Sequence, residues 1–458
     1  MFDLRRYGID RRHYRWTELF LLVLPALFLI IALLTLLVVQ SSGGLVSTTK
    51  VSLPKLDAFV PAFGLIAALL GAHFALNIIA PDADQTILPI AGTLSSIGVI
   101  MALRIGPDLG QPTLGNKQLV FVILGLVCCV GTVKLTQDLR WLRNFKYTWA
   151  VVGIVLVGIT LAHAHSFSSN APGRDVLTFG SGGLSFQPSE ILKICLVIFF
   201  AGYLSENREM LAMASYRIGF LKLPPLKHLG PLVAMLGLAL VIFLGIHELG
   251  LAILIFGLFL SMLYVASNRP VYIVVALLLF GIGALIAYQH IPYAKSRVDI
   301  VHTAFQTGNP DQPATDVSKN AGYQIVQGLV AFGRGGVFGE GLGLGAPCIV
   351  PECNSDYVAS SFGEEFGFAG LLALLGLFML LVYRGMHIAV NNRDTFKQLM
   401  VIGLTAVFAL QTVVILAGNL KIMPLTGIPL PFVAYGGSSL LANFIIIGLL
   451  IRLSQSKA

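Results

Sequence analysis

The chain has 458 residues, of which 56% are hydrophobic and 11% are charged, and its formal net charge is +8 at pH 7. Soluble domains carry about 25% charged residues, so this composition excludes an ordinary soluble protein and indicates a polytopic membrane protein. The positive charge is not concentrated in a basic patch interleaved with aromatic residues, so nucleic acid is not an expected partner.

Apolar runs of about 20 residues are long enough to cross a bilayer as helices. The sequence contains twelve such runs, and the expected fold class is therefore an all-α polytopic membrane protein with about twelve transmembrane helices. The expected spans are 19–39, 57–79, 86–103, 119–136, 147–165, 189–206, 229–247, 249–267, 271–289, 358–383, 398–417 and 431–451. The polar segment 290–357 is expected to form a large extracytoplasmic loop.

Lysines and arginines gather in the segments that a twelve-span topology places on the side of the N-terminus. They include Arg5, Arg6, Arg11, Arg12, Arg15, Arg140, Arg143, Lys146, Arg208, Arg217, Lys222, Lys227, Arg384, Arg393, Lys397, Arg452 and Lys457. Cytoplasmic loops are enriched in these residues, so we expect both termini in the cytoplasm. A basic tail (1–18) and a short C-terminal tail (453–458) then flank the membrane part.

The sequence FQPSE at 186–190 precedes an apolar run, and Lys193 follows one helical turn later. Pro188 suits the first turn of a helix, and Glu190 can accept hydrogen bonds from the free N–H groups there. Glu190 and Lys193 share a helix face. The pair can be a structural ion pair, or Lys193 can face a cavity and meet an anion, because ionisable residues at membrane depth are often functional.

His247 and Glu248 separate two apolar runs. No other His or Cys stands at ligand spacing, so a zinc site is not expected. The segment 322–370 is polar and rich in glycine, and we expect it to be an irregular loop that builds a site. Of Glu364 and Glu365, one is expected to point into the protein with a partner and the other can be solvated.

The glycines of 333–345 lack the G-K-[ST] ending of a P-loop and are expected to allow tight turns and close backbone approach. Cys348 and Cys353 lie in the outer segment, where a disulfide can form. Two unpaired thiols fit the sequence equally well, because spacing alone does not give disulfide geometry.

Four blocks taken together resemble the SEDS family (shape, elongation, division and sporulation), to which RodA and FtsW belong. The blocks are FQPSE-x-x-K at 186–193, GYQ-x-x-Q at 322–327, VPE-x-x-SDY with GEE-x-G at 350–367, and N-x-x-x-x-P-x-TG-x-PLPF-x-x-YGGSS at 419–439. The resemblance implies a catalytic core over 86–452 and leaves two additional helices in 19–85.

The resemblance implies a peptidoglycan glycosyltransferase that polymerises lipid II at the outer face of the bacterial plasma membrane, for elongation or division. It implies an inverting reaction and a class B penicillin-binding protein, a transpeptidase, as partner, with other elongasome or divisome membrane proteins. Protein cations would stabilise the departing pyrophosphate. A divalent cation, Mg²⁺ or Mn²⁺, is the one cofactor that could assist them.

The family has an essential Asp shortly before its GYQ block, in an Asp-Pro pair. Here Asp316 is the nearest counterpart and lacks the proline, and Asp311 is the runner-up; either would act as general base. Glu248 stands where the family usually has Asp. The substrate-binding residues that we expect are Arg104, Gln187, Ser189, Glu190, Lys193, Glu248, Arg334, Asp356, Glu364, Asn419, Lys421 and Ser438.

Two other functions fit the sequence. A lipid II flippase or other transporter would also place charges within the membrane, but it needs a polar path from both faces, and here the unusual residues gather on the outer side. A non-catalytic scaffold that recruits a transpeptidase stays open, because the Asp-Pro motif is altered.

Overall fold

The computed structural model describes residues 14–41, 59–166, 177–179, 184–212, 216–218, 221–223, 226–307 and 321–455. This part is almost entirely helical, which confirms the expected all-α fold. Its two sheets are short antiparallel hairpins, β1 with β2 and β3 with β4. Leu177 is opposite Phe186 in the first, and Tyr216 is opposite Leu223 in the second.

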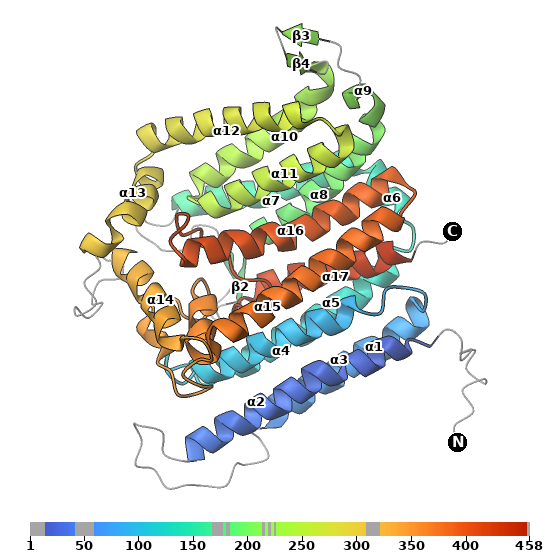
Figure 1. Cartoon of the computed structure of the whole chain (residues 1–458). Helices are drawn as coiled ribbons and strands as arrows, with labels where there is room; N and C mark the ends of the chain where they lie inside the picture. Colours follow the sequence, from blue (N-terminus) through green and yellow to red (C-terminus); the bar gives the residue numbers. More distant parts are fainter. Residues whose placement is uncertain are drawn as a thin grey trace. The chain divides into compact units, whose positions relative to one another are not determined.

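Figure 1 labels the elements along the chain. The elements are α1 (Trp16–Leu21), α2 (Val23–Ser41), α3 (Val60–Ile79), α4 (Ile87–Ile105), α5 (Leu114–Leu135), α6 (Arg140–Asn144), α7 (Lys146–Ser166), β1 (Leu177–Phe179), β2 (Leu184–Phe186), α8 (Pro188–Glu206), α9 (Arg208–Ala212), β3 (Tyr216–Ile218), β4 (Leu221–Leu223), α10 (Leu226–Gly245), α11 (Leu249–Ser267), α12 (Pro270–His290), α13 (Pro292–Thr307), α14 (Ala321–Gly335), η4 (Pro347–Ile349), α15 (Val358–Asn391), α16 (Thr395–Asn419) and α17 (Gly437–Ser454).

Ten helices in the described part are long and apolar enough to cross a membrane, so the protein is a multi-pass membrane protein. Shorter apolar stretches in α7 and α10, Lys146–Thr160 and Gly230–Gly245, coincide with the two other expected spans. The total of twelve remains a prediction. The expected break at His247 and Glu248 is present, because α10 ends at Gly245 and α11 begins at Leu249.

Helices occupy much of the segment that was expected to be an irregular loop. Residues 292–307 form α13, and residues 321–335 form α14. The prediction of a loop from residue 322 is therefore wrong over α14. Tyr323, Val326 and Gln327 are buried and recur at helical spacing, and this pattern outweighs the low helix propensity of the glycines. Asp311 and Asp316 lie outside the described residues.

Two other boundaries differ from the sequence prediction. Helix α15 continues to Asn391 instead of ending at 383, and it is interrupted at Gly367, where φ is 65°. Helix α17 begins at Gly437 instead of 431. Residues 429–436 cannot continue it as helix, because Phe432 has a left-handed backbone with φ of 64°.

The chain forms two compact units. The first contains 1–137, 327–384 and 429–458, and the second contains 138–326 and 385–428. In the first unit α17 and α3 pack on α5, and α2 packs on α4; in the second, α8 packs on α7, α11 and α16.

Small residues allow the helices to approach closely in each unit, as is usual in membranes. A Cβ atom at Gly125 of α5 would lie 2.3 Å from the ring of Phe444 on α17. A Cβ atom at Gly153 of α7 would lie 2.7 Å from Leu192 on α8.

Candidate functional site

Arg104 lies in the last turn of α4 and is held by three groups of the first unit. Its Nε lies 2.7 Å from Oε1 of Glu365, and its Nη1 lies 2.7 Å from Oδ2 of Asp108. Its Nη2 donates to the carbonyl of Gly345 at 2.7 Å. Arg104 was expected to bind a pyrophosphate. In this conformation the carboxylates of Asp108 and Glu365 bind its guanidinium instead.

Glu364 and Glu365 are both buried, although one was expected to be solvated. The N–H of Gly343 donates to Glu365 at 3.1 Å, and that of Ala346 donates to Glu364 at 3.0 Å. Arg334 lies 3.8 Å from Glu364 and is half-exposed. The alternative of a solvated glutamate is wrong, because the preceding backbone at Gly343 and Ala346 supplies N–H donors to both side chains. We call Arg104, Asp108, Arg334, Glu364 and Glu365 the Arg104 cluster.

A glycine-rich turn (residues 335–346) wraps around the two glutamates. The N–H of Glu340 donates to the carbonyl of Glu364 at 2.9 Å, and that of Phe368 donates to Gly336 at 2.9 Å. Gly339 has φ of +85°, and a Cβ atom there would lie 2.2 Å from the carbonyl oxygen of Glu365. The glycines therefore allow close backbone approach, as predicted. The break of α15 at Gly367 completes this arrangement.

Cys348 and Cys353 lie beside the glycine-rich turn in sequence, with their sulfur atoms 2.6 Å apart as free thiols. The hydrogen bond with Cys348, together with burial, raises the pKa of the Cys353 thiol. A disulfide needs about 2.05 Å between the sulfurs, so it requires only a small local movement. The pairing remains a prediction.

A hydrogen bond of 2.8 Å from the N–H of Tyr435 to the carbonyl of Asn354 joins this part of the chain to the segment 429–436. Asp356 and Ser438, two of the expected site residues, are half-buried in the same unit.

The second unit contains a buried ion pair on α8. Nζ of Lys193 lies 2.8 Å from Glu190 and 3.2 Å from Oε1 of Gln411 on α16. Pro188 begins α8, as predicted, and the shared helix face of Glu190 and Lys193 is confirmed. Lys193 does not face an accessible cavity in this conformation, since its side chain is 0% exposed. Of the two alternatives, the geometry therefore supports a structural ion pair between Glu190 and Lys193.

Polar side chains without a partner lie near this ion pair. Among the described residues, Oγ of Ser189 and both side-chain polar atoms of Asn419 are buried and make no hydrogen bond. Leaving such a group unsatisfied costs about 1–3 kcal/mol. Arg208 contacts Thr395, and Lys193 contacts Gln411, so α8 and α16 are antiparallel.

Ser189 at the start of α8 and Asn419 at the end of α16 therefore lie toward the same end of the helix pair.

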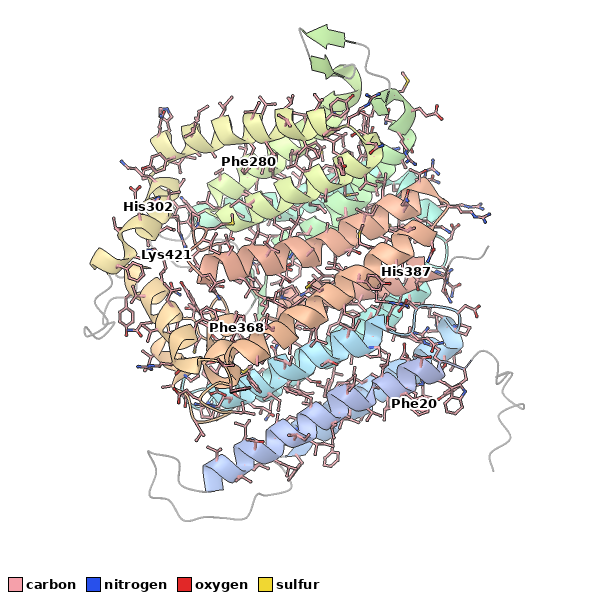
Figure 2. The ribbon with its side chains drawn as sticks, in the orientation of Figure 1. Phe20, Phe280, His302, Phe368, His387 and Lys421 are labelled. Atoms are coloured by element: carbon pink, nitrogen blue, oxygen red, sulfur yellow. The ribbon has the colours of Figure 1, made fainter. Side chains whose placement is uncertain are left out.

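The other expected residues of the second unit lie in turns. Gln187 is the N-cap residue of α8, and Glu248 is the N-cap residue of α11; each makes contacts. Lys421 follows α16 (Figure 2), and its Nζ lies 3.8 Å from the ring centre of Phe305, which is a cation–π contact. The geometry thus divides the expected residues between two units, each with its own polar cluster.

Sequence reasoning missed Asp108 and Gln411. The spacing of Arg104 and Asp108, four residues apart, is the signal that could have found their ion pair. Gln411 lies in an apolar run, and its burial in α16 beside Lys193 depends on the packing of two distant helices.

Comparison with known proteins decides the family. The model of the FtsW, RodA and SpoVE cell cycle proteins matches residues 84–458. The chain belongs to this family. The peptidoglycan glycosyltransferase RodA of Mycobacterium tuberculosis (strain ATCC 25618 / H37Rv) is 32% identical over 448 residues, which cover 96% of this chain and 90% of that protein.

Another relative is a probable peptidoglycan glycosyltransferase FtsW of Geobacter sulfurreducens (strain DL-1 / KN400), which is 32% identical over 81% of this chain and 95% of that protein.

Solved structures share the fold. A chain of a peptidoglycan synthase complex that coordinates polymerization and crosslinking superposes with a TM-score of 0.63 at 22% identity, over 81% of this chain and 98% of that one. Thermus thermophilus RodA superposes with a TM-score of 0.55 at 23% identity, over 81% of this chain and 97% of that one. The expected resemblance to the SEDS family is confirmed.

Proposed function

We propose that the protein polymerises lipid II into glycan strands at the outer face of the bacterial plasma membrane. It is a glycosyltransferase of cell-wall synthesis. The observation that carries this is the match to a peptidoglycan glycosyltransferase over 96% of the chain. Lipid II as substrate, the outer face and the inverting mechanism are what the family resemblance implies, and the two polar clusters offer charged side chains for that chemistry.

In the proposed reaction a sugar hydroxyl attacks an anomeric carbon and forms the new glycosidic C–O bond. The bond between that carbon and the pyrophosphate oxygen breaks, and the lipid pyrophosphate departs with its electron pair. A carboxylate takes the proton of the hydroxyl. We assign this role to Asp316, with Asp311 as the alternative. The displacement inverts the configuration at the anomeric carbon.

Cations stabilise the departing pyrophosphate in this proposal. Arg104 and Arg334 are the candidates in the first unit, and Lys421 is one in the second. Arg104 can fork two N–H groups onto a phosphate, provided that Asp108 or Glu365 releases it.

A divalent cation stays a prediction. The part of the chain that the structure describes contains no group of three or more His, Cys, Asp or Glu residues placed to hold an ion. The carboxylates of the Arg104 cluster are engaged by arginines and backbone N–H groups, so they do not fit such a site, and no step here uses a metal.

A class B penicillin-binding protein is the partner that we propose, with other elongasome or divisome membrane proteins around it. The structural similarity to a chain of a peptidoglycan synthase complex supports this partner. We also propose that both termini are cytoplasmic, because Lys and Arg are enriched on their side of the membrane.

The test uses purified protein in liposomes with labelled lipid II supplied from outside, with and without a candidate transpeptidase. Wild type should give a ladder of glycan polymer, and Asp316→Ala should give none at unchanged thermal stability. If Asp311→Ala alone is inactive, the base moves to Asp311. Translocation of lipid II without polymer would favour the flippase, and neither activity would favour the scaffold.

A further inference from the structure

Three helices, α1 to α3, precede the part of the chain that matches the family, which begins at residue 84. Helix α2 runs alongside α4, and α3 packs on α5 (Figure 1). The 19 residues of α2 span about 29 Å at 1.5 Å per residue, which is close to the hydrocarbon thickness of a bilayer. Helix α2 is therefore long enough to contact both ends of α4.

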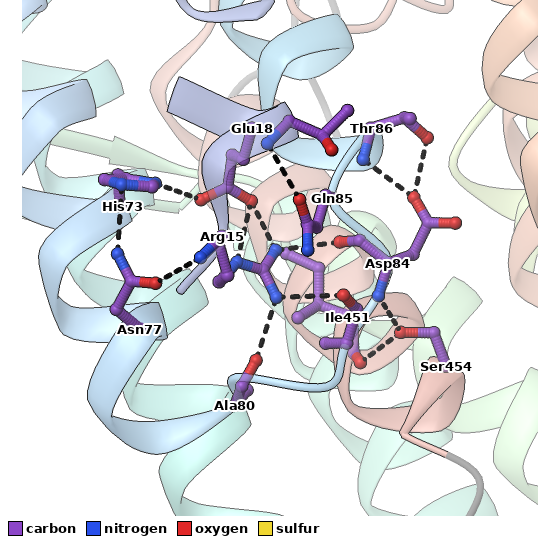
Figure 3. Close-up of polar contacts among 12 residues, drawn as sticks. Arg15, Glu18, His73, Asn77, Ala80, Asp84, Gln85, Thr86, Ile451 and Ser454 are labelled. Carbon is purple, nitrogen blue, oxygen red and sulfur yellow. Dashed lines mark hydrogen bonds and ion pairs between the residues drawn. The ribbon is translucent and has the colours of Figure 1, made fainter. Parts of the chain in front are cut away.

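One end of this helix group is fixed by Arg15, which is 0% exposed (Figure 3). Its Nη1 donates to the carbonyls of Ala80 at 2.8 Å and Ala83 at 3.0 Å. Its Nη2 donates to the carbonyl of Asp84 at 2.8 Å and to Glu18, and its Nε donates to Glu18 at 3.2 Å. These contacts use all five N–H groups of the guanidinium.

Glu18 is also buried and binds α3. Its Oε1 lies 2.7 Å from Nδ1 of His73, and Nε2 of His73 lies 2.9 Å from Nδ2 of Asn77. Oδ1 of Asn77 accepts from the backbone N–H of Arg15 at 3.0 Å, which closes the network. We call Arg15, Glu18, His73 and Asn77 the N-terminal clamp. Because every strong donor in it has a partner, the clamp holds α1 and α3 against the turn before α4.

The clamp also reaches the C-terminal part of the first unit through Asp84. The N–H of Asp84 donates to Oγ of Ser454 at 2.8 Å, and its carboxylate binds Arg384 on α15. Asp84 accepts as well from the N–H and the hydroxyl of Thr86, at 2.8 and 2.6 Å. The turn that Arg15 binds is thus fixed to α4, α15 and α17.

The other end of α2 contacts the glycine-rich turn. A Cβ atom at Gly343 would lie 3.3 Å from Val39 and 3.4 Å from Leu36. The N–H of this glycine donates to Glu365, which binds Arg104. Phe28 also lies with its ring 6.5 Å from that of Phe366, the residue after Glu365. Side chains of α2 therefore form an apolar wall behind the turn that holds the Arg104 cluster.

We infer that helices α1 to α3 brace the glycine-rich turn and act as a positioning element for the Arg104 cluster. The clamp fixes one end of α2, and its buried face, with Leu29, Leu33 and Leu36, packs inward along the unit. Leu36 and Val39 at the far end then limit the outward movement of Gly343. Without that wall the N–H of Gly343 can leave Glu365, and Arg104 loses its orientation. The effect on catalysis rests on the proposed function; the effect on the turn does not.

The test measures amide hydrogen exchange of the full-length protein in nanodiscs, in peptides that cover 335–346. The variant is Leu36→Ala with Val39→Ala, and the matched control is Leu27→Ala with Ile31→Ala, two positions on α2 that are 53% and 55% exposed. Exchange in 335–346 should rise about fivefold in the variant, because the hydrogen bond of the Gly343 N–H opens more often, and it should be unchanged in the control. The conservative variant Leu36→Met with Val39→Ile keeps apolar side chains of similar size, so its exchange in 335–346 should equal that of wild type.

Polymerisation of lipid II, measured on the same samples, should fall several-fold in the Leu36 and Val39 variant alone. Unchanged exchange in 335–346 would overturn the brace, even if activity fell. If the double variant does not fold, Val39→Ala replaces it with the same two outcomes. If exchange in 335–346 rises in the variant but the wild-type protein makes no polymer, the brace is supported and the proposed function is overturned.

Discussion

Arg15 and Arg104 are arginines of the first unit with little or no exposure, but their partners differ. Arg15 binds three backbone carbonyls and one glutamate and is 0% exposed. Arg104 binds two carboxylates and one carbonyl, and its side chain is 12% exposed. Carbonyls belong to the backbone and cannot leave, whereas a carboxylate side chain can be replaced by a phosphate. Arg15 therefore has a structural role, and we propose that Arg104 can exchange an anionic partner.

Of the two arginines, Arg104 should have the larger effect on the rate when it is replaced by alanine. Removing a cation that stabilises developing charge costs about 10²–10³ in rate, so lipid II polymerisation by the folded protein should fall by that factor. Arg104→Lys should recover only part of the rate, because lysine lacks the planar fork. Rates of Arg104→Ala within about twofold of wild type would mean that Arg104 has the same structural role as Arg15.

Arg15→Met should act on stability instead of on the chemical step. It leaves Glu18 buried with one partner fewer, and breaking a buried pair costs about 3–5 kcal/mol of unfolding free energy. Arg15→Met combined with Glu18→Leu should be less destabilised than the single variant, because both charges are then removed. Denaturant unfolding in detergent gives this comparison. Equal loss in both would show that the carbonyl contacts, and not the ion pair, dominate.

Cys348 and Cys353 follow the glycine-rich turn of the Arg104 cluster, and their redox state can be tested directly. We predict that a disulfide joins them outside the cytoplasm, so both cysteines should resist alkylation in membranes until a reductant is added. Mass spectrometry of labelled peptides reports this directly. Ready labelling of both cysteines without reductant would establish them as free thiols.

The smallest effect concerns Asp84, whose turn holds the N-terminal clamp. Burial raises the pKa of Asp84, but hydrogen bonds from Thr86 and the charge of Arg384 outweigh it, and the net pKa lies below its ordinary value. A carboxylate with a lowered folded pKa stabilises the fold above its unfolded pKa of about 3.9, and this contribution is lost as pH falls through the folded pKa.

Asp84→Asn should therefore be less stable than wild type at pH 7, and the difference in melting temperature should shrink at about pH 3. A difference that does not depend on pH would show that charge at Asp84 is unimportant.

The sequence predicted the fold class, the family and most spans, because long apolar runs and linear motifs are local signals. It predicted the pairing of Glu190 with Lys193 for the same reason, since they lie one turn apart. It missed α14, where buried side chains at helical spacing outweighed the glycines. It also missed the burial of Arg15, because the carbonyl partners of this side chain lie more than sixty residues away. The sequence analysis used Arg15 only as one of the positive charges that indicate the cytoplasmic side.

The most direct test of the central claim is polymerisation of externally supplied lipid II by the purified protein with its candidate transpeptidase. The account predicts glycan polymer from wild type and from Asp84→Asn, and none from Asp316→Ala. Polymer from Asp316→Ala and from Asp311→Ala at the wild-type rate would contradict the assigned base. Absence of polymer from wild type with every candidate partner would contradict the proposed lipid II polymerisation itself.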